Sequence, residues 1–435
     1  MTFKNLVKKF TPKFVLTLYH LSLAHLADFI YGSPSKKLIV IGVTGTNGKS
    51  TTVNLIAKIF EEAGFKTALT STINFKISQS DELNKLKMTM PGRFFLQRTM
   101  AQALKEGCSI MIIESSSEGI LQSRQVGVAY DCMVFTNFTP EHLEAHGGFE
   151  NYKQAKLTYF HHLEKLPPKF IDGKKIPKTI ILNIDDAYSG EFQRFHVDQI
   201  ITFGKIKSAN VVGFDLVCSE KGISFRVENI NFNLQLKGIF DFHNSLAAIS
   251  TAQAFDIDLN TSKKALEKIY NVPGRMELIE AGQNFKVVVD YAPEPESLRQ
   301  LYDTVRNWKH EKIIHLLGST GGGRDVARRK ILGQLAAKNA DVVIVTNEDP
   351  YNDDPQQIIH DVADGAVSAG KVIGQNLFRE PDRRKAIAKA LSLAKENYLV
   401  LLTGKGSEQK MAVKDGYIPW DDRVVAREEL QKLKK

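Results

Sequence analysis

The feature that most constrains the fold is a glycine-rich turn between an apolar run and a helical pattern. Residues 39–43 predict a buried strand, residues 44–49 read Thr-Gly-Thr-Asn-Gly-Lys, and Ser-Thr-Thr follows. The backbone N–H groups of such a turn converge on an anion, and the next helix adds its positive end. Lys49 would neutralise the β- and γ-phosphates, and Ser50 would ligate Mg²⁺. The turn therefore predicts a nucleoside triphosphate site on an α/β sheet.

This turn is a narrower variant of the common phosphate loop G-x-x-x-x-G-K-[ST], because Val43 stands where the first glycine would be. A glycine-rich turn before a helix can also be plain turn chemistry. The Lys-Ser-Thr directly after it favours phosphate binding. The expected nucleotide-binding residues of the loop are Gly45, Thr46, Asn47, Gly48, Lys49, Ser50 and Thr51.

The composition is typical of a soluble enzyme. The 435 residues include 43% hydrophobic and 25% charged residues and allow two or three domains. Much of the net charge of +9 comes from lysines near the two ends, and no aromatic-interleaved basic motif is present. Small anionic substrates explain this balance better than nucleic acid does. The three scattered cysteines show no metal spacing and predict a reducing, cytoplasmic protein.

The N-terminal stretch 14–31 carries apolar residues at helical spacing. It also contains His20, His25 and Asp28, which a membrane span would rarely accept, and no signal peptide is expected. We favour an amphipathic helix packed on the following domain. The alternative is a basic helix lying on a membrane surface.

Three blocks follow from the pattern: a short helical leader (1–37), a central domain (38–273) and a C-terminal domain (274–435). The central block predicts a parallel α/β sheet with strands at 38–43, 109–113, 128–135 and 178–183, and residues 200–236 predict a small appended antiparallel sheet. Helices at 244–254 and 263–269 lead to a hinge at 272–274. A second, Rossmann-like α/β domain is expected from strands at 286–290, 312–317, 341–346 and 399–403.

Candidate metal ligands stand at the ends of predicted strands, where open α/β sheets place their sites. Glu114 follows the strand at 109–113 and could hold Mg²⁺ together with Ser50. His142 and His146 are four residues apart and would share a helix face. A zinc pair lacks a third ligand of matching spacing, and a single His142 on a second Mg²⁺ is the other interpretation.

Several further motifs occur in a fixed order along the chain. They are Glu-Ser-Ser-Ser at 114–117, Thr-Asn-Phe-Thr-Pro-Glu-His-Leu-Glu-Ala-His-Gly at 136–147, Tyr-Lys-Gln-Ala-Lys-Leu at 152–157, Pro-Gly-Arg-Met-Glu at 273–277, Val-Asp-Tyr-Ala at 289–292, Gly-Gly-Arg-Asp at 322–325 and Gly-Lys-Gly-Ser-Glu at 404–408. With the phosphate loop, they resemble the successive signatures of the Mur ligases. The resemblance runs from about residue 31 to the end.

The resemblance implies an ATP-dependent carbon–nitrogen ligase of peptidoglycan synthesis, most similar to the tripeptide-forming members of the family. Those members add a third amino acid, L-lysine or meso-diaminopimelate, to UDP-MurNAc-L-Ala-D-Glu through an acyl phosphate. ATP, two Mg²⁺ ions and a CO₂-derived carbamate on a lysine are the implied cofactors. A related ligase acting on a lipid-linked or non-uridylated acceptor is the alternative. A non-catalytic scaffold is disfavoured, because the lysines and metal ligands of the family are present.

Site roles follow from the resemblance, position by position. Lys49, His142, Lys156 and Arg275 match catalytic positions, and Asn244, Arg275 and Asp290 match nucleotide contacts. The matching Mg²⁺ ligands are Ser50, Glu114, His142 and carbamylated Lys156. The muramyl dipeptide would contact Thr89, Ser116, Gln122 and Arg124, and the incoming amino acid would contact Arg324, Glu348, Asp349, Tyr351, Gly404 and Glu408. From its pattern alone, Lys156 would be an ordinary exposed lysine of a helix.

Departures from the family pattern bear on the two substrates. Only 37 residues precede the central block, where the family has a uridine-binding domain of roughly a hundred residues. Thr89-Met90-Pro91 lacks one hydroxyl of a usual threonine pair. Tyr351 replaces the arginine that clamps the far carboxylate of diaminopimelate, and a phenol cannot form that bidentate charged pair. L-Lysine therefore becomes at least as good a candidate.

Overall fold

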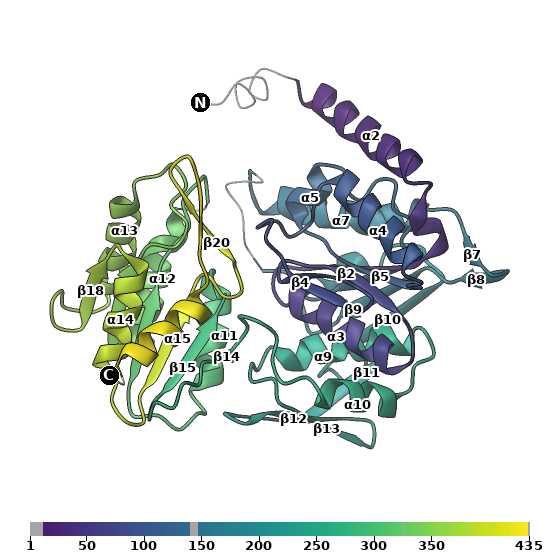
Figure 1. Cartoon of the computed structure of the whole chain (residues 1–435). Helices are drawn as coiled ribbons and strands as arrows, with labels where there is room; N and C mark the ends of the chain where they lie inside the picture. Colours follow the sequence, from purple (N-terminus) through teal and green to yellow (C-terminus); the bar gives the residue numbers. More distant parts are fainter. Residues whose placement is uncertain (1–11, 140–146, 325, 434–435) are drawn as a thin grey trace.

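The computed structural model describes residues 12–139, 147–324 and 326–433. Two sheets form its framework, an eleven-stranded sheet and a six-stranded sheet, each covered by helices (Figure 1). The large sheet belongs to residues 38–273 and the smaller one to residues 274–435, which we call the central and C-terminal domains. The predicted α/β class is confirmed.

The large sheet has the strand order β13-β12-β11-β10-β9-β6-β1-β5-β2-β3-β4. Its middle is parallel, from β11 to β2, and antiparallel hairpins extend it at both edges. Its strands are β1 (Ile39–Thr44), β2 (Thr67–Thr70), β3 (Asn74–Ile77), β4 (Ser80–Leu83), β5 (Ile110–Glu114), β6 (Cys132–Phe135), β9 (Thr179–Asn183), β10 (Gln199–Gly204), β11 (Val211–Ser219), β12 (Gly222–Val227) and β13 (Ile230–Leu234).

Helices cover both faces of the large sheet, because its parallel strands are apolar on both sides. One face packs against α3 (Lys49–Glu62), α9 (Asp241–Gln253) and α10 (Leu259–Glu267). The other packs against α4 (Arg93–Lys105), α5 (Ser117–Leu121), α7 (Phe149–Lys165) and α8 (Ser189–Phe192). A short hairpin of β7 (Lys169–Ile171) and β8 (Lys174–Ile176) follows α7.

The C-terminal sheet has the order β14-β15-β19-β16-β17-β18 and is parallel except for β14. Its strands are β14 (Glu277–Leu278), β15 (Lys286–Asp290), β16 (Ile313–Leu317), β17 (Val342–Thr346), β18 (Leu377–Glu380) and β19 (Leu399–Thr403). One face packs against α11 (Pro295–Val305), α12 (Ala327–Asn339) and α13 (Pro355–Ser368), and the other against α14 (Arg383–Leu393) and α15 (Asp422–Leu433). A hairpin of β20 (Lys410–Val413) and β21 (Gly416–Pro419) projects from the sheet.

Most of the predicted strands are present within one residue of their expected ends, and three differences stand out. The strand predicted at 128–135 is only β6 (Cys132–Phe135). Just before it, the Asp131 carboxylate accepts a hydrogen bond from Val40 N (2.8 Å) and pairs with Lys169, while the Asp131 backbone bonds to Val40 O and Thr179 N. Residues 199–204 form β10 in the parallel part of the sheet instead of the antiparallel part. The hairpin strands β2 to β4 were not predicted, because short polar strands lack a clear apolar alternation.

The leader contains helix α2 (Lys13–Ile30), which lies along the outer edge of the central domain (Figure 1). It meets α4, and the alanines Ala24 and Ala27 are fully buried. Several of its large apolar side chains are exposed, with Leu18 at 59% and Phe29 at 82%. The predicted packing on the next domain is therefore present along one face of the helix, where Leu16, Leu21 and Leu23 are half-buried, and the rest of the apolar surface is exposed. Among the helices of the described ranges, none combines the length and the hydropathy needed to cross a bilayer.

Candidate active site

The phosphate loop connects β1 to α3, and Gly48 with a left-handed φ of +80° immediately precedes the helix. Side chains of the neighbouring strand end hold the loop: Thr136 Oγ1 donates to Asn47 O (2.7 Å), and Asn137 Oδ1 accepts from Asn47 N (2.9 Å). Lys49 Nζ donates back to Thr46 O (2.7 Å). The loop is thus preorganised with the N-terminus of α3 directed at the space where an anion would bind.

Both of the loop's key glycines are required sterically. A Cβ on Gly45 would lie 1.9 Å from Thr136 Oγ1, and a Cβ on Gly48 would lie 2.1 Å from Asn244 Oδ1. Both also have positive φ, at +152° and +80°. The buried Asn47 Nδ2 has no hydrogen-bond partner in the described structure. A polar group left unsatisfied in a preformed cradle fits a bound phosphate, whose oxygens would accept that hydrogen bond.

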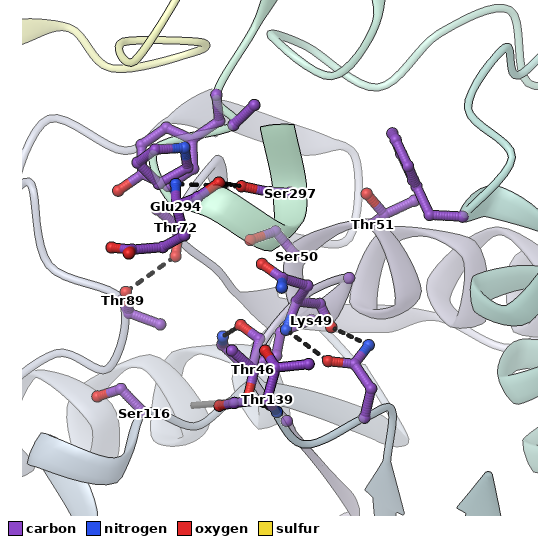
Figure 2. Close-up of a pocket in the computed structure, with 18 of the residues that line it drawn as sticks. Thr46, Lys49, Ser50, Thr51, Thr72, Thr89, Ser116, Thr139, Glu294 and Ser297 are labelled. Carbon is purple, nitrogen blue, oxygen red and sulfur yellow. Dashed lines mark hydrogen bonds between the residues drawn. The ribbon is translucent and has the colours of Figure 1, made fainter. Parts of the chain in front are cut away.

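Glu114 ends β5 and is buried beside the phosphate loop. Its two carboxylate oxygens accept hydrogen bonds from Thr72, one from the backbone N–H (2.6 Å) and one from the hydroxyl (2.9 Å). The Thr72 hydroxyl also bonds to Thr89 Oγ1 (3.0 Å), and Figure 2 shows these groups around the cavity that Ser50 borders. Each carboxylate oxygen keeps a lone pair for a hard cation such as Mg²⁺.

Lys156 is buried, not exposed, and this corrects the expectation from its helical pattern. Only 1% of the residue is exposed, and Nζ donates to Gly45 O (2.7 Å) while lying 4.8 Å from the centre of the Tyr152 ring. Helix α7 therefore directs this lysine inward, onto the phosphate loop. The sequence pattern missed this because a lysine in a helix is usually exposed, whereas Lys156 lies with Ala155 and Leu157 among the buried residues of α7.

His142 lies outside the described residues, so its predicted position on a second Mg²⁺ stays a prediction. In the described ranges, no group of three or more His, Cys, Asp or Glu side chains is arranged to hold a metal ion. One carboxylate, one hydroxyl and phosphate oxygens suit Mg²⁺, which usually keeps several water ligands.

One cavity of about 550 Å³ joins the two domains at the phosphate loop. All of the predicted site residues in the described ranges line it, except Gln122, Arg124 and Gly404. Gly404 lies just behind Glu348, since a Cβ there would come within 2.3 Å of Glu348 Oε2. Gln122 and Arg124 bond to each other (2.7 Å), and Arg124 also bonds to Met90 O beside Thr89. The fold thus gathers residues that are more than 350 positions apart in the chain.

The predicted hinge is a tight turn bridged between Val272 and Arg275. Gly274 has φ of +63°, and a Cβ on it would clash with the backbone of Ser407 at 2.1 Å. Arg275 stacks its guanidinium 4.5 Å from the centre of the Tyr291 ring. Asp290 accepts from Met276 N (2.7 Å) and Ala292 N (2.9 Å), so it braces the turn as well as lining the cavity.

Burial shifts two carboxyl groups on the nucleotide side of the cavity. It raises the pKa of Asp241 to about 7, against the opposing hydrogen bonds from Asn244 and Gly238. It also raises the pKa of Asp290, against the charge of Arg275. Asn244 Nδ2 donates to Asp241 Oδ1 (3.1 Å), which fixes the amide next to the phosphate loop.

The end of the cavity where the incoming amino acid is predicted to bind is crowded with charges. Asp349 and Glu408 share Lys405, whose side chain is completely buried, and Glu348 accepts a hydrogen bond from Thr320 Oγ1 (2.7 Å). Lys87 also reaches this cluster from the central domain, which the sequence did not indicate. Its only signal was its place two residues before Thr89, and that spacing implies no contact with a residue 262 positions later.

Two arginines near this end of the cavity already form ion pairs with carboxylates. Arg328 is buried against Glu294, and Arg329 pairs with Asp361 (2.9 Å) and Asp353 (3.4 Å). Burial raises the pKa of the Tyr351 phenol to about 12, so the group is a neutral hydrogen-bond donor at physiological pH.

Comparison with known proteins agrees with this geometry. The family model of the Mur ligase middle domain matches residues 43–252, and that of the Mur ligase glutamate ligase domain matches residues 274–406. The chain is 37% identical over 410 residues to the UDP-N-acetylmuramoyl-L-alanyl-D-glutamate–2,6-diaminopimelate ligase of Geobacillus thermodenitrificans, covering 93% of this chain and 81% of the relative.

Two further matches agree with it. The chain is 36% identical to a UDP-N-acetylmuramyl-tripeptide synthetase of a Roseiflexus species, covering 95% of this chain and 82% of the relative. A solved structure of a UDP-N-acetylmuramoyl-L-alanyl-D-glutamate–2,6-diaminopimelate ligase superposes with a TM-score of 0.61 at 27% identity, over 92% of this chain and 79% of that one. With family models on both sides of the cavity, the chain belongs to the Mur ligase family.

Proposed function

We propose that the protein is an ATP-dependent ligase that adds the third amino acid to UDP-MurNAc-L-Ala-D-Glu in peptidoglycan biosynthesis. The observation that carries the proposal is the single cavity in which the phosphate loop, Glu114 and buried Lys156 face the charged pocket of the C-terminal domain. The relatives named for this reaction support the assignment. The proposed domain boundaries are residues 37/38 and 273/274.

The chemistry follows from which groups face each other. The carboxylate of D-Glu attacks the γ-phosphorus of ATP, and the bond to the β–γ bridging oxygen breaks to release ADP. Lys49 and the N-terminus of α3 stabilise the charge that develops on the phosphates. The amino group of the third amino acid then attacks the acyl phosphate, loses a proton and expels phosphate. The enclosing C-terminal domain keeps water from hydrolysing the acyl phosphate.

Ser50, Glu114, His142 and Lys156 are the residues that would hold Mg²⁺, which supplies charge neutralisation between the phosphates and the attacking carboxylate. Lys156 fits this role only as a carbamate, because an ammonium would repel the cation. Its ammonium would lose one proton, and the free amine would add to CO₂ with release of a second, which turns a cation into an anion beside Gly45. Its burial against the phosphate loop supports the modification.

The proposal is tested by phosphate release over a matrix of muramyl acceptors and amino acids. We expect release that requires ATP, Mg²⁺, UDP-MurNAc-L-Ala-D-Glu and a diamino acid together, with a product heavier than the acceptor by one amino acid residue in mass spectrometry. Release with a non-uridylated or lipid-linked acceptor alone would favour the other ligase reaction. No release with any pair would reject catalysis.

The exposed apolar face of α2 favours a second candidate, a Mur-type ligase that works on a lipid-linked acceptor. At least 39% of each residue is exposed at Val15, Leu18, Leu26 and Phe29. Residues 1–37 contain six lysines and a single acidic residue, Asp28, so the segment suits an anionic lipid surface.

We therefore expect the protein to co-sediment with vesicles rich in anionic phospholipid and much less with zwitterionic ones. Leu18→Ser with Phe29→Ser should reduce binding about a hundredfold or more, since each apolar side chain that the lipid buries contributes about 1.5–3 kcal/mol. Phe170→Ser, at an apolar residue 61% exposed elsewhere, is the matched control and should bind normally. Equal binding of all forms, or none, would contradict membrane contact.

A further inference from the structure

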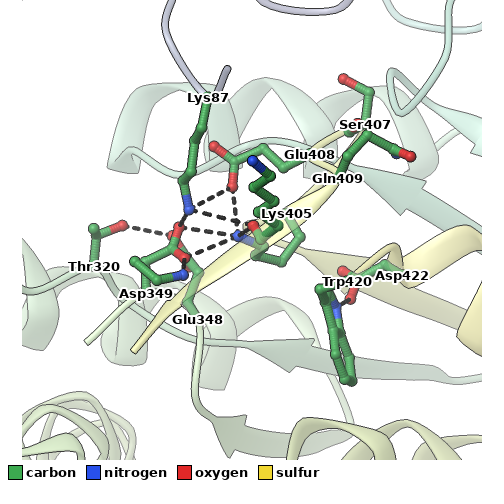
Figure 3. A network of polar contacts seen from close by, with 12 residues as sticks. Lys87, Thr320, Glu348, Asp349, Lys405, Ser407, Glu408, Gln409, Trp420 and Asp422 are labelled. Carbon is green, nitrogen blue, oxygen red and sulfur yellow. Dashed lines mark hydrogen bonds and ion pairs between the residues drawn. The ribbon is translucent and has the colours of Figure 1, made fainter. Parts of the chain in front are cut away.

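Four charged side chains form a closed cluster at the boundary between the domains (Figure 3). Lys405 Nζ lies 3.0 Å from both oxygens of Asp349 and 2.5 Å from Glu408 Oε2. Ala412 N donates to Asp349 Oδ1 (2.6 Å). These groups all belong to the C-terminal domain. The fourth, Lys87, comes from the central domain.

Lys87 enters the cluster at its centre. Its ammonium pairs with Asp349 and with Glu408 (3.2 Å), donates to Lys410 O (3.4 Å), and lies 5.8 Å from the centre of the Tyr351 ring. Only 9% of its side chain is exposed. It therefore contacts the residues that the family resemblance assigns to the incoming amino acid.

The loop that carries Lys87 is held in place by its own contacts. Asn84 donates to Ser71 O (2.8 Å) and Met88 O (3.0 Å), and its Oδ1 accepts from Leu86 N (2.8 Å). Lys87 itself has a left-handed φ of +54°, which is uncommon for a residue with a side chain and persists only when surrounding contacts fix it. The same loop continues to Thr89, at the acceptor side of the cavity.

The charge balance of the cluster depends on Lys87. Without it, two buried carboxylates would share one lysine, and an unpaired buried charge is costly. Burial alone would lower the pKa of Lys87, but Glu408 and Asp349 outweigh burial and raise it, so the amine stays charged. With Lys87 present, Asp349 pairs with two lysines and accepts a hydrogen bond from one backbone N–H, so its charge is already balanced. Glu348 also lines the cavity and pairs with neither lysine, so it is the carboxylate better placed to bind a substrate ammonium.

We propose that Lys87 is a positioning residue of the amino-acid pocket, which completes the pocket across the domain boundary. It neutralises the Asp349–Glu408 pair only when the domains are closed, and so couples binding of the third amino acid to the loop that contacts the acceptor. This inference rests on the proposed ligase function. It assigns Asp349 to the frame of the pocket and Glu348 to the substrate.

Lys87→Met tests the proposal, with steady-state kinetics for each of the three substrates. We expect the KM for the third amino acid to rise about tenfold or more. Without Lys87, Asp349 and Glu408 share only Lys405, and the unpaired buried charge disturbs the pocket that binds this amino acid. The KM for ATP should stay within about twofold, since the nucleotide binds on the other side of the cavity. Lys87→Arg, which keeps the charge, should restore most of the loss.

Lys286→Met is the matched control. Within the described ranges, ion pairs link the domains at two places, and the second is Lys286 with Glu220 (3.0 Å), away from the cavity. This variant should leave all three KM values unchanged. In Lys87→Met with Asp349→Asn, the loss should be smaller than the product of the two single losses, because one substitution removes the charge that the other leaves unpaired.

An unchanged amino-acid KM in Lys87→Met, an equal effect in Lys286→Met, or multiplicative losses in the double variant would overturn the proposal. Thermal unfolding of each variant shows whether a loss comes from misfolding instead. If the unmodified protein forms no tripeptide with any amino acid, the proposed function itself fails. The kinetic comparison applies only once that turnover is measured, so the two failures are distinguishable.

Discussion

Lys156→Ala should abolish ligase turnover while ATP still binds. Lys156 lies buried at the phosphate loop, where its amine donates to Gly45 O (2.7 Å). If it carries a carbamate, the variant loses an anion that holds Mg²⁺ at the reacting phosphates, and kcat should fall by about a hundred- to a thousandfold or more. Millimolar bicarbonate should not rescue it. Steady-state phosphate release and calorimetric titration with ATP measure the two effects.

Lys153→Ala is the matched control for this prediction. Lys153 lies on the same helix, less than one turn earlier, and pairs with Glu150 (3.0 Å) and Glu191 (2.7 Å) outside the cavity. It should retain nearly full turnover, since pairs of this kind contribute little. Full activity in Lys156→Ala would remove the carbamate from the mechanism. A mass increase of one CO₂ on a peptide containing Lys156 would support it directly.

The unmodified protein should use L-lysine at least as well as meso-diaminopimelate. By the sequence resemblance, Tyr351 occupies the position at which the diaminopimelate ligases of the family have an arginine. That arginine binds the distal carboxylate of diaminopimelate. Three arginines could reach the same carboxylate from the other side of the pocket: Arg324, which lines the cavity, and its neighbours Arg328 and Arg329. Arg328 and Arg329 are already paired with carboxylates of their own domain, so Arg324 is the one that a diaminopimelate preference would point to. A bidentate pair contributes about 1.5–3 kcal/mol, so its loss should cost about ten- to a hundredfold in kcat/KM for diaminopimelate.

Tyr351→Arg should then shift the ratio of kcat/KM values toward diaminopimelate by about the same factor. Tyr417→Arg is the control, because Tyr417 is close to Tyr351, with 6.5 Å between the two ring centres, but is 55% exposed and does not line the cavity. Its added charge should leave the ratio unchanged. Several relatives are named as diaminopimelate ligases, so a strong diaminopimelate preference in the unmodified protein is the result that would defeat the inference from Tyr351.

Local sequence patterns predicted much of the framework. The β1–loop–α3 unit could be read from the sequence because its glycines and Lys-Ser-Thr are contiguous, and the parallel strands because their apolar runs are short and strongly bounded. The strands β2, β3 and β4, of which β4 forms one edge of the sheet, were missed, since they are only four residues long and show no clear apolar alternation. The packing of α2 on the central domain was expected, but the exposure of residues such as Phe29 was not, because apolar periodicity identifies a face without showing what covers it.

The phosphate loop, the α/β class and the family can all be read from short motifs and apolar runs, whose residues are neighbours in the chain. How the individual side chains act depends instead on the packing of the folded protein. Burial of Lys156 depends on how α7 packs against the sheet. The contact between Lys87 and Asp349, which are 262 residues apart in the chain, depends on how the two domains meet. Burial and charge pairing are set by everything that surrounds a group in space, and a linear pattern does not contain that information.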